Sequence, residues 1–300
     1  MIPVLRELRV PFLSASVVNV LFGGATAYYC VGAVDWLKFA LCVVGVALGH
    51  LGSNVANDYF DHRSGNDEAN PTPTPFSGGS RVIQRGLMSP RAVLVEALVC
   101  FAGAAAIGLY LNAVSPGNTV LWIALTGGLL GYLYTAWPVR LGYRGLGELT
   151  IAIAFGPLPV LGTHFVLTHR FDAVPILGGC ALGLLVALIL YANEFPDYNA
   201  DKAVDKRTLP VLLGLRAGWV GYVVVLAAAY GVIAVGVVAA VLPRAALIGL
   251  LPLPLGLWAA RHIRQHLEQP LALVPACAAT VILHAATGML LAVGVAMVGK

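Results

Sequence analysis

Residues 173–205 read AVPILGGCALGLLVALILYANEFPDYNADKAVD, an apolar run that leads directly into a cluster of acidic side chains. No charged residue occurs in this stretch before Glu194, so the run is long enough to cross the hydrocarbon core of a bilayer as a helix, which takes about 20 residues. A carboxylate at the end of such a segment is costly unless a cation compensates it. The stretch therefore predicts a membrane-spanning helix that presents negative charge to a bound cation.

The rest of the chain also has the composition of an integral membrane protein. Of its 300 residues, 59% are hydrophobic and 11% are charged, against about 25% charged in soluble domains. We predict an all-α, polytopic membrane protein in which residues 1–300 form a single transmembrane domain, with nine helices around a central cavity. The nine predicted spans are residues 12–33, 36–57, 91–113, 118–137, 147–168, 173–195, 215–242, 245–261 and 271–298.

The distribution of basic residues predicts the orientation of these spans. With the N-terminus in the cytoplasm, fourteen Lys and Arg residues lie inside and four lie outside, which the positive-inside rule favours strongly. This orientation puts the C-terminus outside and the acidic segments on the cytoplasmic side of the cell inner (cytoplasmic) membrane. The net charge of +4 restates the same bias, so we expect no nucleic-acid partner.

A second acidic segment, residues 57–67, also follows an apolar run. Its sequence is NDYFDHRSGND, and together with residues 193–205 it holds six of the chain's eight aspartates. Both segments begin with the pattern Asn-x-x-x-Asp, which suggests two similar helix bundles that face one another. The predicted cytoplasmic loops attached to them, residues 58–90 and residues 197–214, are long, as functional loops often are.

Helical geometry relates the acidic residues within each segment. In the first, four side chains fall within about 100° of arc and can point into one cavity: Asn54, Asn57, Asp58 and Asp61. We expect the helix to stop at Gly65 and the turned chain to bring Asp67 back toward them. In the second, four side chains recur at every fourth position: Asn193, Asp197, Asp201 and Asp205. Pro196 predicts a kink or a break in that helix, because it removes the hydrogen bond to the carbonyl of Ala192.

Oxygen ligands without His or Cys favour magnesium, which is typically shared between carboxylates and substrate phosphates. The predicted metal ligands are Asn57, Asp58, Asp61, Asp67, Asn193, Asp197 and Asp201, and the four central aspartates Asp58, Asp61, Asp197 and Asp201 are the candidate catalytic residues. Two ions would offset four of the six carboxylate charges and bridge to a diphosphate, and in a bilayer the natural diphosphate carrier is a lipid.

Basic and aromatic side chains complete the predicted site. Residues 77–81, Ser-Gly-Gly-Ser-Arg, can present backbone N–H groups to an anion and form part of a lid. The predicted diphosphate-binding residues are Ser80, Arg81, Arg85, Lys202, Lys206 and Arg207. The predicted substrate pocket adds Asn54, Tyr59, Tyr134, Arg140, Tyr198 and Asp205, since an allylic cation requires aromatic faces and exclusion of water.

These motifs resemble the UbiA-type superfamily of intramembrane prenyltransferases, across essentially the whole chain. Within it, four segments look most like the 1,4-dihydroxy-2-naphthoate polyprenyltransferases of menaquinone biosynthesis: residues 57–67, 76–80, 142–148 and 208–214. The resemblance implies two Mg²⁺ ions held by both acidic motifs, an isoprenyl diphosphate, and transfer of its chain to the naphthoate ring with loss of the carboxylate, giving demethylmenaquinone.

The chain departs from the superfamily pattern at two places. Gly65 stands where the common first motif has Asp, and Asp67 follows instead, a variant associated with the naphthoate branch. A Tyr-x-x-x-Lys element found in many members is met by Tyr134 but by Pro138 in place of Lys, so no lysine role carries over, although Arg140 stands nearby.

Two alternatives stay open at this point. One is a prenyltransferase of the same superfamily that uses 4-hydroxybenzoate, homogentisate, a tetrapyrrole or a glyceryl lipid as acceptor. The other is a divalent-cation transporter, because carboxylates within a membrane often mark ion paths. Transport sites usually lie near the midplane, whereas these acids lie at the ends of spans. The general base is also open, among Glu96, Glu148, His50 and His62.

Overall fold

The structure, a computed structural model, describes residues 10–299, and within them every regular element is a helix. The two chain ends lie outside the described residues. So do Arg6 and Arg9, which are among the fourteen basic residues predicted to lie inside, and Lys300, which is among the four predicted to lie outside. The elements are η1 (Val10–Leu13), α2 (Ser14–Val31), α3 (Trp36–Ser64), α4 (Asn66–Ala69), α5 (Pro90–Ala113), α6 (Thr119–Thr135), η2 (Leu141–Tyr143), α7 (Gly147–Phe155), α8 (Pro157–Thr168), α9 (Ala173–Ala203), α10 (Leu209–Leu213), α11 (Leu215–Val238), η3 (Arg244–Leu250), α12 (Leu253–Gln265), η4 (Pro270–Leu273) and α13 (Val274–Ala296).

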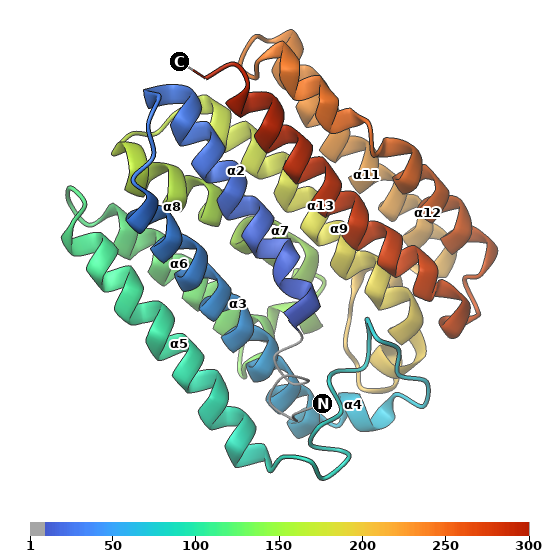
Figure 1. Cartoon of the computed structure of the whole chain (residues 1–300). Helices are drawn as coiled ribbons and strands as arrows, with labels where there is room; N and C mark the ends of the chain where they lie inside the picture. The colour runs from blue at the N-terminus through green and yellow to red at the C-terminus, as the bar shows by residue number, and fades with distance from the viewer. Residues whose placement is uncertain (1–9, 300) are drawn as a thin grey trace.

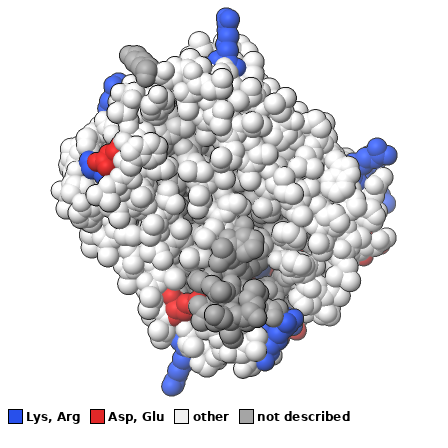
Figure 2. Space-filling model, in the orientation of Figure 1, with Lys and Arg blue, Asp and Glu red and all other residues white. Residues whose placement is uncertain are grey.

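The all-α, membrane-spanning class is confirmed. Eight segments are long and apolar enough to cross a membrane by length and composition. The remaining predicted span coincides with α6, an apolar helix of 17 residues that falls short of that length, so the count of nine stays a prediction. On the face in Figure 2, a broad uncharged surface lies between charged side chains near its margins, as expected for a protein surrounded by lipid.

Helix α9 lies at the centre of the bundle, as Figure 1 shows, and contacts α2, α7, α8, α11 and α13. The large core cluster forms around it, with fully buried side chains such as Leu185, Tyr222 and Leu283. The second close pairing is between α3 and α5. The C-terminal ends of α3 and α9 both adjoin α4 and therefore lie at the same end of the bundle.

Helix α3 continues through the first acidic segment. Asp35 caps its N-terminus by accepting hydrogen bonds from the backbone N–H groups of Leu37 and Lys38, each at 3.1 Å. The helix ends at Gly65, which adopts the left-handed conformation with φ 78°, where a side chain would be strained. The predicted stop is confirmed, so residues 58–64, at the start of the predicted loop 58–90, are helical.

Helix α9 continues through Pro196. The predicted break at this residue is therefore wrong. Proline still leaves the carbonyl of Ala192 without its backbone donor. The buried thiol of Cys277, from α13, donates to that carbonyl at 3.4 Å. A neighbouring helix thus supplies the missing partner, which sequence spacing alone does not reveal.

The predicted span 147–168 consists of two helices, α7 and α8, that meet at Gly156. Gly156 lies so close to the backbone of Gly183 that a side chain at either position would clash. The side-chain amide of Asn19 donates to the carbonyl of Phe155 at this junction. The break brings α7 close to α9 and shapes the apolar part of the cavity described below.

Candidate active site

A cavity opens between the C-terminal ends of α3 and α9, with about 1200 Å³ of empty space including its open mouth. Its polar part is lined by Asn54, Asn57, Asp61, Asn66, Asp67, Asn193, Glu194, Asp197, Asp201 and Lys206. Its apolar part is lined by Phe12, Ala15, Leu130, Ile151, Ala154, Phe155, Val186, Ile189 and Leu190. One space therefore combines a concentration of carboxylates with a hydrocarbon-like surface.

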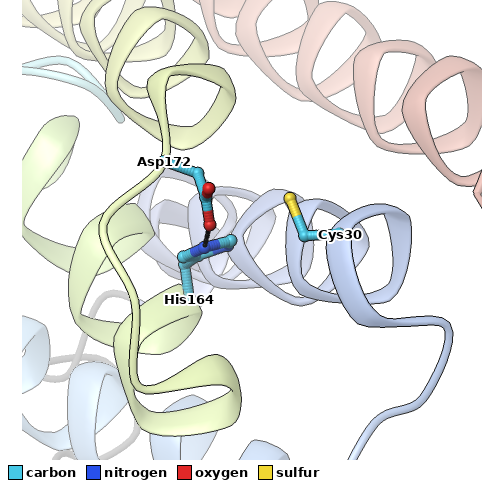
Figure 3. Close-up of side chains that lie close together, drawn as sticks. All are labelled: Cys30, His164 and Asp172. Carbon is cyan, nitrogen blue, oxygen red and sulfur yellow. Dashed lines mark hydrogen bonds and ion pairs between the residues drawn. The ribbon is translucent and has the colours of Figure 1, made fainter.

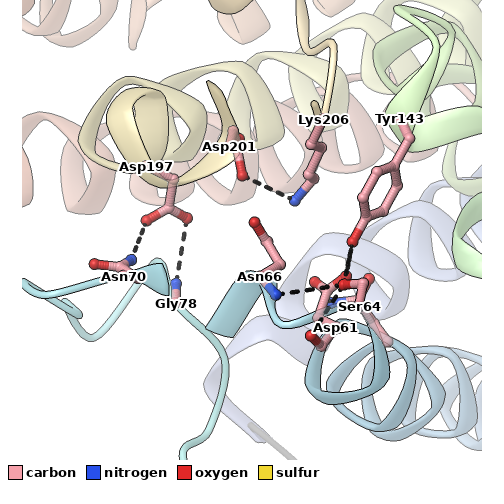
Figure 4. A network of polar contacts seen from close by, with 10 residues as sticks. Asp61, Ser64, Asn66, Asn70, Gly78, Tyr143, Asp197, Asp201 and Lys206 are labelled. Atoms are coloured by element: carbon pink, nitrogen blue, oxygen red, sulfur yellow. Dashed lines mark hydrogen bonds and ion pairs between the residues drawn. The ribbon is translucent and has the colours of Figure 1, made fainter. Parts of the chain in front are cut away.

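Asp61 of the first motif is held by two neutral hydrogen-bond donors. It is buried and accepts hydrogen bonds from the phenol of Tyr143 at 2.7 Å and from the side-chain amide of Asn57 at 3.0 Å. Burial raises the pKa of Tyr143, so the phenol keeps its proton and serves as a donor. Ser64 lies 2.8 Å from the same phenol (Figure 4). These contacts hold the Asp61 carboxylate in one orientation before any ligand binds.

Asp67 returns to the cavity after the chain turns at Gly65, as predicted. Its carboxylate lies against Gly79, where an added Cβ would come within 2.6 Å of Oδ2, so glycine is required there. Gln84 donates to the carboxylate at 3.3 Å, and the guanidinium of Arg81 donates to the backbone carbonyl of Asp67. Burial and the nearby carboxylates of Asp61 and Asp58 raise the pKa of Asp67 to about 8.

Asp58 is buried but is not among the residues that line the cavity. Its Oδ2 accepts a hydrogen bond from the backbone N–H of Ser80 at 2.8 Å. Of the four side chains expected to share one cavity, Asn54, Asn57 and Asp61 do so, and Asp58 instead faces the loop. Because the N–H of Ser80 already has a carboxylate partner within the protein, the loop does not present it to an external anion.

The carboxylates of the second motif face those of the first across the cavity (Figure 4). Asp197 accepts from the side-chain amide of Asn70 at 2.6 Å and from the backbone N–H of Gly78 at 3.2 Å. Asp201 is buried and pairs with Lys206, whose Nζ lies 3.3 Å from its Oδ1. Asn193 lines the same cavity, and its buried Oδ1 has no hydrogen-bond partner.

Lys206 is the central cation of the site. The chain turns back after α9 with the N–H of Lys206 donating to the carbonyl of Asp201 at 2.8 Å, and its side chain is only 14% exposed. Burial opposes its charge, but the carboxylates of Asp201 and Asp61 outweigh that effect and raise the pKa of Lys206 well above its usual value. One lysine thus balances carboxylates from both motifs.

Most of the predicted diphosphate-binding residues lie elsewhere. Arg85 and Lys202 are exposed, and Arg81 is held at the carbonyl of Asp67. Asp205 and Arg207 pair with each other at 3.1 Å on the surface, with side chains 80% and 60% exposed. The four-residue recurrence fails at Asp205 because α9 ends at Ala203, and the assignment of Asp205 to the pocket is therefore corrected.

The predicted pocket aromatics are divided in the same way. Tyr134 lines the cavity, whereas Tyr59 lies outside the lining and contacts Phe60 with ring centroids 5.3 Å apart. Tyr198 is also absent from the lining and lies near Lys202. Arg140 is stacked on the ring of Tyr143, with its guanidinium carbon 3.6 Å from the centroid. Arg140 therefore packs against the aromatic ring whose hydroxyl donates to Asp61.

Several residues of the site were not predicted. Tyr143 and Asn70 are the donors to Asp61 and Asp197. Tyr143 lies in the segment 142–148 that carries the family resemblance, which was the available signal, whereas Asn70 carried none beyond lying in a polar connection. Glu194 lines the cavity and is buried with Glu148, which accepts a hydrogen bond from the backbone N–H of Leu209 at 3.0 Å. Glu194 adjoins Asn193 in the sequence, so its place in the second acidic segment was the available signal.

The residues present suit the magnesium that the family resemblance implies. The facing carboxylates of Asp61, Asp67, Asp197 and Asp201 supply hard oxygen donors, and the orphaned Oδ1 of Asn193 supplies a neutral one. Among the residues that line the cavity there is no cysteine, and His50 is the one histidine. It lies toward the apolar part and is hydrogen-bonded to Ser16. The donor set therefore favours a hard divalent cation over zinc or iron.

Comparison with known proteins agrees with this geometry. The sequence pattern of the UbiA prenyltransferase family matches residues 16–272. The chain is 31% identical to 1,4-dihydroxy-2-naphthoate octaprenyltransferase of Bacillus subtilis, over 94% of this chain and 88% of the relative. It is 34% identical to the enzyme of the same name from Mycobacterium tuberculosis, over 84% of this chain and 82% of that one.

Among solved structures, a UbiA homologue from Archaeoglobus fulgidus bound to DMAPP and Mg²⁺ has the same fold. The TM-score is 0.70 at 17% sequence identity, and the match covers 97% of this chain and 99% of the homologue. Together with the sequence match, these findings show that the chain belongs to the UbiA prenyltransferase family.

Proposed function

We propose that this protein transfers a polyprenyl chain from an isoprenyl diphosphate to 1,4-dihydroxy-2-naphthoate, with loss of the carboxylate, to give demethylmenaquinone. The carrying observation is the cavity in which aspartates from the ends of α3 and α9 face one another above an apolar lining. The acceptor assignment is supported by the relatives named 1,4-dihydroxy-2-naphthoate octaprenyltransferase and by the pairing of Gly65 with Asp67 in the first motif.

We assign two Mg²⁺ ions to the polar part of the cavity. Asp61 and Asp67 would hold one side, and Asp197 and Asp201 the other, with the amide oxygens of Asn57 and Asn193 as neutral donors. When bound, the ions neutralise the diphosphate and so make it a better leaving group. The Archaeoglobus fulgidus homologue, bound to DMAPP and Mg²⁺, supports this use of the site.

The chain's own residues perform the remaining tasks. Lys206 adds a fixed positive charge beside Asp201, where the charge of the leaving diphosphate develops. The apolar lining, including Phe155, Ile189 and Leu190, takes the prenyl chain and excludes water from the reacting carbon. Tyr134 and Phe12 place aromatic rings on the cavity wall, where a ring face can stabilise an allylic cation.

The proposed reaction is balanced without a further reactant. The bond between the allylic carbon and the diphosphate oxygen breaks, and the diphosphate keeps the electron pair. The ring carbon that bears the carboxylate forms a bond to the allylic carbon. The bond from that carbon to the carboxylate then breaks, its electron pair returns to the ring, and carbon dioxide is released as the ring regains aromaticity. Diphosphate, carbon dioxide and the prenylated ring are therefore expected in equal amounts.

The test is product analysis with purified full-length protein, Mg²⁺, a prenyl diphosphate and 1,4-dihydroxy-2-naphthoate. We expect diphosphate and carbon dioxide to be released together with the prenylated naphthoquinol. The screen should include 4-hydroxybenzoate, homogentisate, a tetrapyrrole and a glyceryl lipid. Prenylation without decarboxylation, or prenylation of another acceptor only, would reject the naphthoate assignment. Magnesium flux into liposomes without diphosphate cleavage would favour the transporter instead.

We also propose that the cavity opens on the cytoplasmic side of the cell inner membrane, with the C-terminus outside. The positive-inside bias supports this orientation. A thiol-reactive, membrane-impermeant probe should label a single cysteine introduced at Arg85 only after the cell is made permeable. Labelling of intact spheroplasts at that position would invert the proposed topology.

A further inference from the structure

A second cluster of metal-ligating side chains lies at the other end of the bundle. Within the described residues, Cys30, His164 and Asp172 offer a sulfur, a nitrogen and an oxygen that all lie within 4.8 Å of one another. They come from the end of α2, from α8 and from the start of α9 (Figure 3), and the sulfur points toward the other two. Asp172 and Asp197 are at opposite ends of α9, roughly 38 Å apart at 1.5 Å per residue. The cluster is therefore separate from the acidic cavity.

The contacts of His164 fix the direction in which each ring nitrogen faces. Nδ1 lies 3.0 Å from the hydroxyl of Thr26, which also lies 2.8 Å from the carbonyl of Gly23. Nε2 faces the carboxylate of Asp172. The neutral ring can carry its proton on either nitrogen, so with the proton on Nδ1 it offers the lone pair of Nε2 to a ligand.

Nε2 of His164 lies 2.9 Å from Oδ2 of Asp172, and the imidazole is completely buried. Without a metal, a proton on Nε2 is donated to this carboxylate. When a metal replaces that proton, Nε2 and the carboxylate oxygen are two adjacent ligands, and the sulfur of Cys30 lies within 4.8 Å of both.

Asp172 is oriented for this site rather than for capping its own helix. It occupies the N-cap position of α9 with extended backbone, where an aspartate usually accepts from the first backbone N–H groups, yet its side chain makes no capping hydrogen bond. One oxygen faces His164, and the other lies 3.7 Å from the guanidinium of Arg170, which is 62% exposed. The carboxylate therefore faces α8 and the side chain of Arg170 rather than the first backbone N–H groups of its own helix.

We propose that Cys30, His164 and Asp172 bind a divalent transition-metal ion of the zinc class. Thiolate, imidazole and carboxylate are the ligands of tetrahedral Zn²⁺ sites, and water would take the fourth position. With the metal bound, the Nδ1–H of His164 would donate to Thr26, 3.0 Å away, and this outer contact would fix the ring for metal binding through Nε2. Binding releases the thiol proton of Cys30 and any proton on Nε2. The ion would tie the end of α2 to the junction of α8 and α9.

Cobalt substitution tests the proposal, because thiolate-bound Co²⁺ has a near-ultraviolet charge-transfer band that oxygen ligands do not produce. Full-length protein without a histidine tag is titrated with Co²⁺ in the presence of excess Mg²⁺, which occupies the acidic cavity. We expect the band to saturate at one equivalent and to disappear when Zn²⁺ is added. Absence of the band in the unmodified protein would overturn the proposal whatever the variants do.

Variants assign the ligands. Cys30→Ser should abolish the band, whereas Cys180→Ser, an exposed cysteine of α9 outside the cluster, should leave it unchanged. Zn²⁺ should raise the melting temperature of the protein, and this rise should disappear in Cys30→Ser and in Asp172→Asn. Both measurements are made on variants that still elute as the folded species. A band that survives Cys30→Ser, or that is lost equally in Cys180→Ser, contradicts the assignment.

Thr26→Val tests the outer contact of the imidazole. It removes the acceptor of the Nδ1 proton without touching a ligand, so Zn²⁺ affinity should fall by about 10- to 100-fold, the usual effect of losing such an outer contact. Unchanged affinity would contradict the proposed role of Thr26 and, with it, metal binding through Nε2 of His164.

Discussion

The two acidic motifs look like copies of one pattern, but they are held in different ways. In the first, the helix stops at Gly65, and the carboxylate of Asp61 is fixed by neutral donors, the phenol of Tyr143 and the amide of Asn57. In the second, α9 continues to Ala203, and Asp201 is balanced by the ammonium of Lys206. The first half is organised by hydrogen bonds, and the second is organised mainly by charge.

This difference suggests a division of labour within one site. Neutral donors orient the Asp61 carboxylate without cancelling its charge. Lys206 is ion-paired with Asp201, so it weakens the attraction of Asp61 for a metal cation less than that of Asp201. An ammonium ion reduces that attraction but can also bind the diphosphate oxygens. We therefore expect the first motif to respond to substitution mainly through metal binding, and the second also through diphosphate binding.

Both acidic motifs are expected to be essential for activity. Asp61→Ala and Asp197→Ala should each lower turnover by about a thousand-fold or more, the equivalent of roughly 4 kcal/mol of transition-state stabilisation by bound metal. Product formation from prenyl diphosphate and naphthoate measures the loss. A variant that keeps more than a tenth of the activity would remove that residue from the metal site.

Removal of the shared cation should have the next largest effect. Lys206→Met leaves Asp201 buried without its ion-pair partner and should lower kcat/KM for the prenyl diphosphate by about a hundred-fold, or roughly 2.7 kcal/mol. The matched control is Lys202→Met, four residues earlier and exposed, which should keep nearly full activity. Equal losses in the two variants would show that Lys206 acts only through the overall charge.

The neutral donors of the first motif should matter less. Tyr143→Phe removes one hydrogen bond to the Asp61 carboxylate, which is worth about 1.5 kcal/mol, so the apparent affinity for Mg²⁺ should fall by about ten-fold. The KM for the prenyl diphosphate at saturating Mg²⁺ should change little. A change in that KM alone would place the phenol at the diphosphate rather than at the metal.

Asp67 should make metal binding depend on pH. Its pKa is raised to about 8, above its ordinary value, so below pH 8 the carboxyl holds a proton that the metal must displace. Affinity for Mg²⁺ should therefore rise by about five-fold between pH 7 and pH 8 and level off above pH 9. Calorimetry in buffers of different ionisation enthalpy measures the released proton, and Asp67→Asn should lose this dependence.

The smallest effect is expected at the exposed pair that follows the second motif. Asp205→Asn and Arg207→Gln should each change turnover by less than about two-fold, because an exposed ion pair contributes little and neither side chain lines the cavity. A loss of ten-fold or more in either variant would show that this segment closes over the substrate during the reaction.

Local features of the sequence predicted much of this site. Gly65 can adopt a positive φ, so the stop of α3 and the return of Asp67 followed from residue type. The spacing of Asn57 and Asp61 placed both on one helix face. The spacing of Asn193 with Asp197 and Asp201 did the same, as long as the helix continued. These are short-range consequences of backbone geometry, and they were confirmed where the chain stayed regular.

Long-range contacts decided the remainder. Asp58 faces the loop because Ser80 offers it an N–H, and Asp205 leaves the cavity because α9 ends two residues earlier. Pro196 is tolerated because Cys277, 81 positions later in the chain, supplies a donor to the carbonyl of Ala192. No spacing rule relates such residues.

By itself, the sequence determined that this chain spans a membrane through helices, and it predicted that two acidic helix ends hold a hard divalent cation. Composition and helical periodicity are sufficient for that, because the bilayer permits few ways to satisfy the backbone. Only the tertiary structure decided that Lys206 and Tyr143 organise the cavity and that Cys30, His164 and Asp172 meet at the opposite end. Such meetings depend on which helices are neighbours, and residues distant in the sequence become neighbours only when the helices assemble.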